Sequence, residues 1–109
     1  ESQFHVLEYL TSQQKAKPSD LIHYLATTPA AITTLLDRME KNNLIVRERD
    51  ESDRRIVWIH MTRRGEEELK RGLEIREQFL RPYFNRISKH NQQLLIYLLG
   101  KMINEQDSA

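Results

Sequence analysis

The pattern of apolar and polar positions predicts a mainly helical chain with one β-hairpin. Residues 4–10 place apolar side chains on one side of a helix, and a polar break follows over residues 11–17. Two short helices are expected next, over residues 18–26 and 29–42, each opening with a proline, which suits a first helical position. Joined by a tight turn, they predict a helix-turn-helix, although the turn lacks the glycine often found there.

The second helix of this pair is amphipathic. Its apolar side chains have helical spacing, and they are Ile32, Leu35, Leu36 and Met39. We expect Thr28 to cap the first turn, and Asn42-Asn43 to end the helix because asparagine tolerates left-handed backbone geometry. The opposite side carries small and basic residues, namely Ala30, Ala31, Thr33, Thr34, Arg38 and Lys41. This side is the predicted recognition surface of the helix-turn-helix.

A charged loop between two strand-like runs follows. The second run, residues 56–61, is β-branched and aromatic, with Val57, Ile59 and Met61 on one side of the pleat. The loop over residues 49–55 reads Arg-Asp-Glu-Ser-Asp-Arg-Arg. Arginines at an exposed hairpin tip suit a protein that reaches into a groove of DNA, and no catalyst needs them there. The hairpin is therefore predicted to be a wing.

The last third of the chain predicts two helices that serve dimerisation. Thr62 is expected to cap a long helix, which Pro82 should kink or interrupt, and Ser88 to cap a last one. The last helix has a wide apolar surface, formed by Leu94, Leu95, Leu98, Leu99, Met102 and Ile103. Because one small domain cannot cover such a surface, we expect a homodimer. The expected fold is mainly α with a small β-hairpin wing, with residues 1–62 as the DNA-binding lobe and residues 63–109 as dimerisation helices within a single structural domain.

Composition narrows the location and the class of protein. The 109 residues suit one domain, and 17 Lys+Arg against 16 Asp+Glu give a net charge of only +1. A DNA-binding surface must therefore come from local clustering of basic residues. The absence of cysteine excludes thiol-based sensing and cysteine-rich zinc sites in this stretch and fits a reduced cytoplasm. No apolar run approaches the roughly 20 residues of a membrane span and no signal peptide is visible, so a cytoplasmic protein without a membrane partner is expected.

The titratable residues do not predict catalysis. The four histidines are scattered without the paired spacing of metal ligands, so we expect no metal site and no cofactor. Asp, Glu and Ser form no recognisable nucleophile–base arrangement, and we expect a binding protein, not an enzyme.

Several segments together resemble the MarR family of winged helix-turn-helix bacterial transcriptional regulators. In the family's order and spacing they are Gln3-Phe4-His5-Val6-Leu7; Pro18-Ser19-Asp20-Leu21; Thr28-Pro29-Ala30-Ala31-Ile32-Thr33 with Leu36-Asp37-Arg38-Met39-Glu40; Leu44-Ile45 followed by Arg47; and Asp53-Arg54-Arg55 followed by Met61-Thr62-Arg63-Arg64-Gly65. Thr34 departs from the arginine of many members, and Met61 replaces the usual leucine, a volume-conserving change. The family's first helix, which helps build the dimer interface, is absent, so we expect these residues to be part of a longer chain.

The resemblance implies a repressor that binds a pseudo-palindromic operator as a homodimer. Helix 29–42 would read the major groove and the wing 49–55 the minor groove, where Asp53 would orient Arg55 through a charge-assisted hydrogen bond. The candidate DNA-binding residues are Lys17, Ser19, Thr28, Ala30, Ala31, Thr33, Thr34, Arg38, Asp53, Arg54 and Arg55. A small-molecule effector, which the sequence does not identify, would change the separation of the helices and release DNA.

Two alternatives stay open at this stage. Each candidate side chain could belong to a plain solvated surface, and for Arg54 a phosphate contact and a solvated charge are equally favoured. The chain could also be a winged-helix protein–protein interaction module that does not bind DNA, which would explain its near-zero net charge. Such a module has no need for the Asp53-x-Arg55 pair, so the wing favours the regulator.

Overall fold

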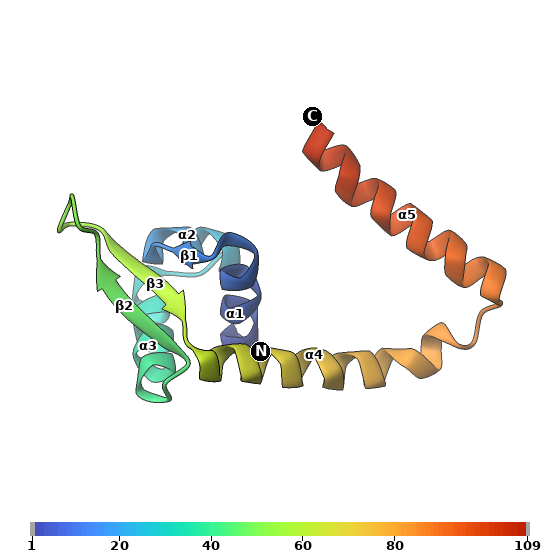
Figure 1. Cartoon of the computed structure of the whole chain (residues 1–109), viewed down its shortest axis with the longest axis horizontal. Helices are drawn as coiled ribbons and strands as arrows, with labels where there is room; N and C mark the ends of the chain where they lie inside the picture. The colour runs from blue at the N-terminus through green and yellow to red at the C-terminus, as the bar shows by residue number, and fades with distance from the viewer. Residues whose placement is uncertain (1, 109) are drawn as a thin grey trace. The chain divides into compact units, whose positions relative to one another are not determined.

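The structure, a computed structural model, describes the backbone of residues 2–108 and the side chains of residues 2–104. In this part of the chain five helices accompany a three-stranded sheet (Figure 1). The elements are α1 (Ser2–Gln13), β1 (Lys15–Ala16), α2 (Pro18–Leu25), α3 (Pro29–Lys41), β2 (Ile45–Arg49), β3 (Val57–Met61), α4 (Arg63–Phe84) and α5 (Lys89–Ser108). The chain divides into two compact units, Glu1–Leu73 and Glu74–Ala109. The predicted fold class, mainly α with a small hairpin wing, is confirmed.

The sheet is antiparallel, with the strand order β1-β3-β2. The predicted hairpin is β2–β3, in register from Ile45 opposite Met61 to Arg49 opposite Val57. The sequence did not predict β1, because residues 11–17 were expected to be a polar break. Instead α1 continues to Gln13, and Gln14, with φ 70°, turns the chain so that two residues pair with β3. A two-residue strand is too short to show an alternating pattern.

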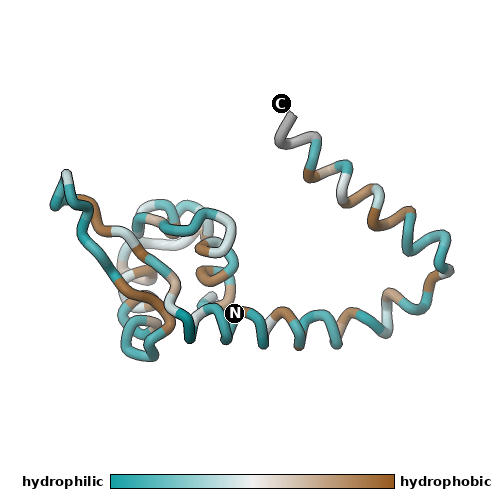
Figure 2. The backbone as a smooth tube through the Cα atoms, in the orientation of Figure 1, coloured by the Kyte–Doolittle hydropathy of each residue, from teal (hydrophilic) through white to brown (hydrophobic). Residues whose placement is uncertain are grey.

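The core of the first unit collects apolar side chains from every element between α1 and the start of α4. The buried set is Val6, Leu7, Leu10, Ala16, Leu21, Ile32, Leu36, Met39, Leu44, Ile45, Ile59 and Leu69. The predicted stripe of α3 is confirmed, since Ile32, Leu36 and Met39 are at most 2% exposed and Leu35 packs against the same core. Figure 2 shows hydrophobic positions interspersed with hydrophilic ones along this segment. Helix α3 is therefore held to the core by its inner side, and its outer side is exposed.

Three predicted N-caps and the predicted end of α3 are confirmed. Thr28, Thr62 and Ser88 each accept a hydrogen bond on Oγ from the backbone N–H three residues later, at 3.2, 3.0 and 3.1 Å. At the other end of α3, Asn43 has φ 63°, the left-handed geometry expected of this asparagine.

The turn of the helix-turn-helix is closed without a glycine. Ala26 follows α2 with φ 51° and ψ 50°, so an alanine occupies a left-handed position where glycine is usual. Its N–H donates to the His23 carbonyl at 3.2 Å, and the Thr27 N–H donates to the Ile22 carbonyl at 3.1 Å. This pair of bonds is a Schellman motif, and it satisfies carbonyls that the end of α2 would leave without partners.

Helix α4 is not interrupted at Pro82 but continues to Phe84, so of the two expected effects, a kink or an interruption, the interruption is wrong. A proline this close to a C-terminus removes a donor only from the last turn. The hydrogen bond from the Asn85 N–H to the Arg81 carbonyl, 2.9 Å, continues the helical pattern past it. In α5 the six predicted apolar residues are between 40% and 66% exposed, Leu95 being the least and Met102 the most exposed.

Candidate nucleic-acid interface

The outer side of α3 presents small side chains at its N-terminal end. Thr28, Ala30, Ala31, Thr33, Thr34 and Arg38 are all exposed. The hydroxyl of Thr33 donates to the Pro29 carbonyl at 2.9 Å, and that of Thr34 donates to the Ala30 carbonyl at 3.2 Å. Because these hydroxyl hydrogens are engaged within the helix, the two threonines can offer methyl groups and oxygen lone pairs to a ligand. Small side chains of this kind allow close approach to base edges, and a threonine methyl can pack on a thymine methyl.

Thr34 and Arg38 share one flank of α3, since they are four residues apart. Both line a hollow whose other walls come from the N-terminal turns of α1 and from the turn between α2 and α3. His5 and Thr27 are among its polar lining residues. Arg38 therefore lies on the side of α3 that shares this hollow with α1.

The predicted pair at the wing is present. Arg55 donates from Nε to Asp53 Oδ1 at 3.0 Å and from Nη2 to Asp53 Oδ2 at 2.9 Å, and its backbone N–H donates to Oδ1 at 3.0 Å. The bidentate bond lowers the pKa of the Asp53 carboxyl and raises the pKa of the Arg55 guanidinium. The Arg55 side chain is nevertheless 89% exposed. It is a solvent-facing cation, paired with Asp53, at the tip of a hairpin.

Asp50 holds the base of the wing loop, a role that the sequence analysis missed. Its Oδ2 accepts bonds from the Ser52 N–H and hydroxyl and from the Asp53 N–H, at 3.0, 3.1 and 3.0 Å. Its Oδ1 accepts a bond from Nε1 of Trp58 on β3 at 2.8 Å. These bonds, that from Trp58 first, lower the pKa of Asp50 from 3.8 to about 2. An aspartate two residues before a serine indicates such a turn, but the bond to Trp58 could not be predicted from sequence.

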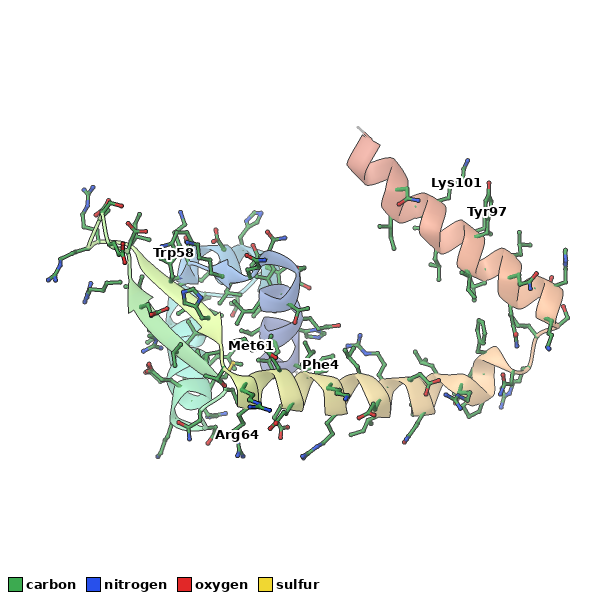
Figure 3. The ribbon with its side chains drawn as sticks, viewed as in Figure 1. Phe4, Trp58, Met61, Arg64, Tyr97 and Lys101 are labelled. Atoms are coloured by element: carbon green, nitrogen blue, oxygen red, sulfur yellow. The ribbon has the colours of Figure 1, made fainter. Side chains whose placement is uncertain are left out.

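Other basic side chains lie around this loop. Arg49 donates from Nη1 to the Arg54 carbonyl at 2.8 Å, and the Arg54 side chain is exposed. The ammonium of Lys15 lies 4.2 Å from the ring centroid of Trp58, close enough for a cation–π interaction (Figure 3 labels Trp58). The wing loop is thereby joined to β2 through Arg49 and, by way of Trp58 and Lys15, to β1.

The N-terminus of α2, where Lys17 and Ser19 were expected to bind phosphate, already carries an acid. Asp20 accepts a hydrogen bond from the Lys17 N–H on Oδ2 at 2.9 Å. Ser19 is exposed and Lys17 is half-buried. The carboxylate of Asp20 makes this end of the helix less attractive to a phosphate than a bare N-terminus would be.

Strand β2 is joined to α3 by an ion-pair network that the sequence analysis also missed. Arg47 donates from Nη2 to Asp37 Oδ1 at 2.8 Å and from Nη1 to Glu40 Oε1 at 3.3 Å. Several acids of the lobe are thus hydrogen-bonded within the protein, and they are Asp20, Asp37, Glu40, Asp50 and Asp53. Exposed basic side chains remain on α3 and on the wing, at Arg38, Lys41, Arg54 and Arg55.

Two further classes of site are absent from the described part of the chain. Among these residues no cluster of three or more His, Asp or Glu side chains is arranged to hold a metal ion. None of the described helices combines the length and apolar character needed to cross a membrane.

Comparison with known proteins identifies the family. The model of the MarR family matches residues 1–57. The chain is 32% identical to the uncharacterized HTH-type transcriptional regulator YkoM of Bacillus subtilis over 92% of its length, and spans 65% of that protein. It is 28% identical to the transcriptional regulator HosA of Escherichia coli O157:H7 over 94% of its length, and spans 76% of that protein. A solved structure of an S. aureus MepR variant bound to an oligodeoxyribonucleotide has a similar fold, with a TM-score of 0.70 and 24% identity over 96% of this chain and 78% of the other. As its motifs predicted, the chain belongs to the MarR family.

Proposed function

We propose that the protein is a sequence-specific DNA-binding transcriptional regulator. In this proposal α3 reads the major groove and the wing loop, residues 49–55, enters the minor groove. The observation that carries it is the guanidinium of Arg55, which is exposed at a hairpin tip and is bonded through its Nε and Nη2 atoms to Asp53. The relatives named as transcriptional regulators and the MepR variant bound to an oligodeoxyribonucleotide support the same function.

The candidate residues divide into two kinds of contact. The small exposed side chains at the start of α3, together with Arg55, are proposed to approach the bases. Phosphate contacts are proposed for Arg38, Arg54, Lys17 and Ser19. Lys17 and Ser19 should contribute least, because the carboxylate of Asp20 lies beside them.

The functional unit is proposed to be a homodimer on a pseudo-palindromic operator. The exposed apolar residues of α5, from Leu94 to Ile103, supply a surface for a second copy. Two-fold symmetry would then place two recognition helices one helical turn of DNA apart, roughly 34 Å between centres.

The alternative, a protein-interaction module without DNA binding, does not account for the wing. A partner protein would give no reason to hold an arginine outward in a bidentate bond while Asp50 fixes the base of the loop. The relatives' names likewise favour the regulator.

The mode of regulation that we propose is repression in the bacterial cytoplasm, with release of DNA when a small-molecule effector binds. It follows from the family alone. A regulator needs neither catalysis nor a cofactor, and we propose none.

A mobility-shift screen of genomic fragments tests the proposed function. The full-length protein is titrated against fragments at about 50 and 200 mM salt, because nonspecific electrostatic binding weakens steeply between these concentrations. The proposal predicts a small set of fragments that remain shifted at the higher salt. Equal loss of binding to every fragment would contradict it.

A further inference from the structure

Arg47 lies at the middle of β2, on the side of the strand that faces α3. Side chains alternate along a strand, so Arg47 shares this side with Ile45, which is 1% exposed in the core. The Arg47 side chain is itself only 30% exposed, against 89% for Arg55. Arg47 is therefore turned inward, unlike the arginine at the wing tip.

The guanidinium of Arg47 bridges two carboxylates of α3. Asp37 and Glu40 are three residues apart, which places them on one side of the helix. Each carboxylate accepts a hydrogen bond from a different nitrogen of the guanidinium, Asp37 at 2.8 Å and Glu40 at 3.3 Å. Partly exposed ion pairs contribute about 0–1 kcal/mol each to the stability of a fold, but they restrict how the two elements that they join can lie. This network joins the recognition helix to the strand that leads into the wing.

We propose that Arg47 is a positioning residue for DNA recognition. It sets the orientation of α3 relative to the wing strand, so that the recognition helix and Arg55 meet one operator site together, and it does so without contacting DNA. The inference rests on the proposed function.

A direct phosphate contact by Arg47 is the competing role, and the two acids distinguish it. If Arg47 contacted phosphate, neutralising Asp37 and Glu40 would release the guanidinium and strengthen operator binding. If Arg47 positions α3, the same change removes the carboxylate partners through which Arg47 holds the helix. Operator binding should then weaken relative to nonspecific binding.

The test compares three variants of the full-length protein by fluorescence anisotropy. These are Arg47→Gln, the double variant Asp37→Asn with Glu40→Gln, and the control Arg71→Gln, which breaks an exposed ion pair with Glu68 on α4. Kd is measured for an operator and for unrelated DNA over a salt series. Arg47→Gln and the acid double variant should each lower the ratio of operator to nonspecific affinity about tenfold, the scale of one lost specific contact. The slope against log salt should stay within about half a unit of the parent in Arg47→Gln, and Arg71→Gln should keep the parent's ratio.

The outcomes separate the inference from the function on which it rests. Failure of the parent to discriminate the operator would contradict the proposed function itself. With a discriminating parent, an acid double variant that keeps or raises the ratio would overturn the positioning role. A loss of about one unit of salt slope in Arg47→Gln would also overturn it, because it indicates a lost phosphate contact. If Arg47→Gln does not fold, the acid double variant decides alone, since Asp37 and Glu40 are 60% and 44% exposed.

Discussion

Replacing Ala26 by glycine should stabilise the helix-turn-helix. The left-handed conformation costs an L-residue about 1–2 kcal/mol, and Ala26 adopts it with φ 51°. Glycine removes this cost but gives the unfolded chain extra freedom worth about 0.4–1 kcal/mol. The side chain of Ala26 is exposed, so little burial is lost. The net expectation is a gain of about 0.5–1 kcal/mol in the free energy of unfolding.

Urea unfolding followed by tryptophan fluorescence measures this gain at one fixed protein concentration, because self-association shifts apparent stability. The matched control is Ala31→Gly, the same chemical change within the helical backbone of α3. It should destabilise by about 0.5–1 kcal/mol. The unfolded-state effect is common to the two variants and cancels in their difference, which should be about 1–2 kcal/mol. Equal destabilisation by both glycines would refute the assignment of strain to Ala26.

Three further predictions concern the wing, the recognition helix and the dimer. Arg38→Ala should weaken binding evenly across DNA sequences and flatten the slope against log salt by about one unit; an unchanged slope would exclude a phosphate contact. Because the pKa of Asp50 is lowered from 3.8 to about 2, its bond to the indole of Trp58, the chain's one tryptophan, should persist below pH 3.8 and be lost as the pH falls through about 2. The indole N–H resonance reports this, and a midpoint near 3.8 would contradict it. The double variant Leu98→Glu with Met102→Glu should convert the proposed full-length dimer to a monomer and abolish tight operator binding. Sedimentation at micromolar concentration measures this, and a variant that remains dimeric would show that α5 is not the interface.

The sequence predicted those parts of the fold that local chemistry determines. The buried stripe of α3 follows from helical spacing, the helix ends follow from Thr28 and Ser88, and the hairpin follows from alternation. Strand β1 was not predicted, because its two residues form a strand only by pairing with β3, which is distant along the chain. Pro82 does not interrupt α4, because a proline two residues before the end of a helix removes a donor only from the last turn.

The candidate site was predictable in a similar way. The Asp53–Arg55 pair spans two residues, so its sequence motif already indicates the contact. The bond from Trp58 to Asp50 and the bridge from Arg47 to α3 join residues that only the folded hairpin brings together. The sequence therefore indicated the candidate DNA contacts and the local Asp53–Arg55 pair, but not the bonds of Asp50 and Arg47 to residues more distant along the chain.

The measurement that tests the account most directly is operator binding by Arg55→Ala in the full-length protein. The side chain is 89% exposed, so the variant should fold like the parent, which circular dichroism checks. Removal of a contact to the minor groove should raise the operator Kd about 5- to 150-fold and change nonspecific binding much less. An operator Kd equal to that of the parent would contradict the assignment of the hairpin as a DNA-binding wing.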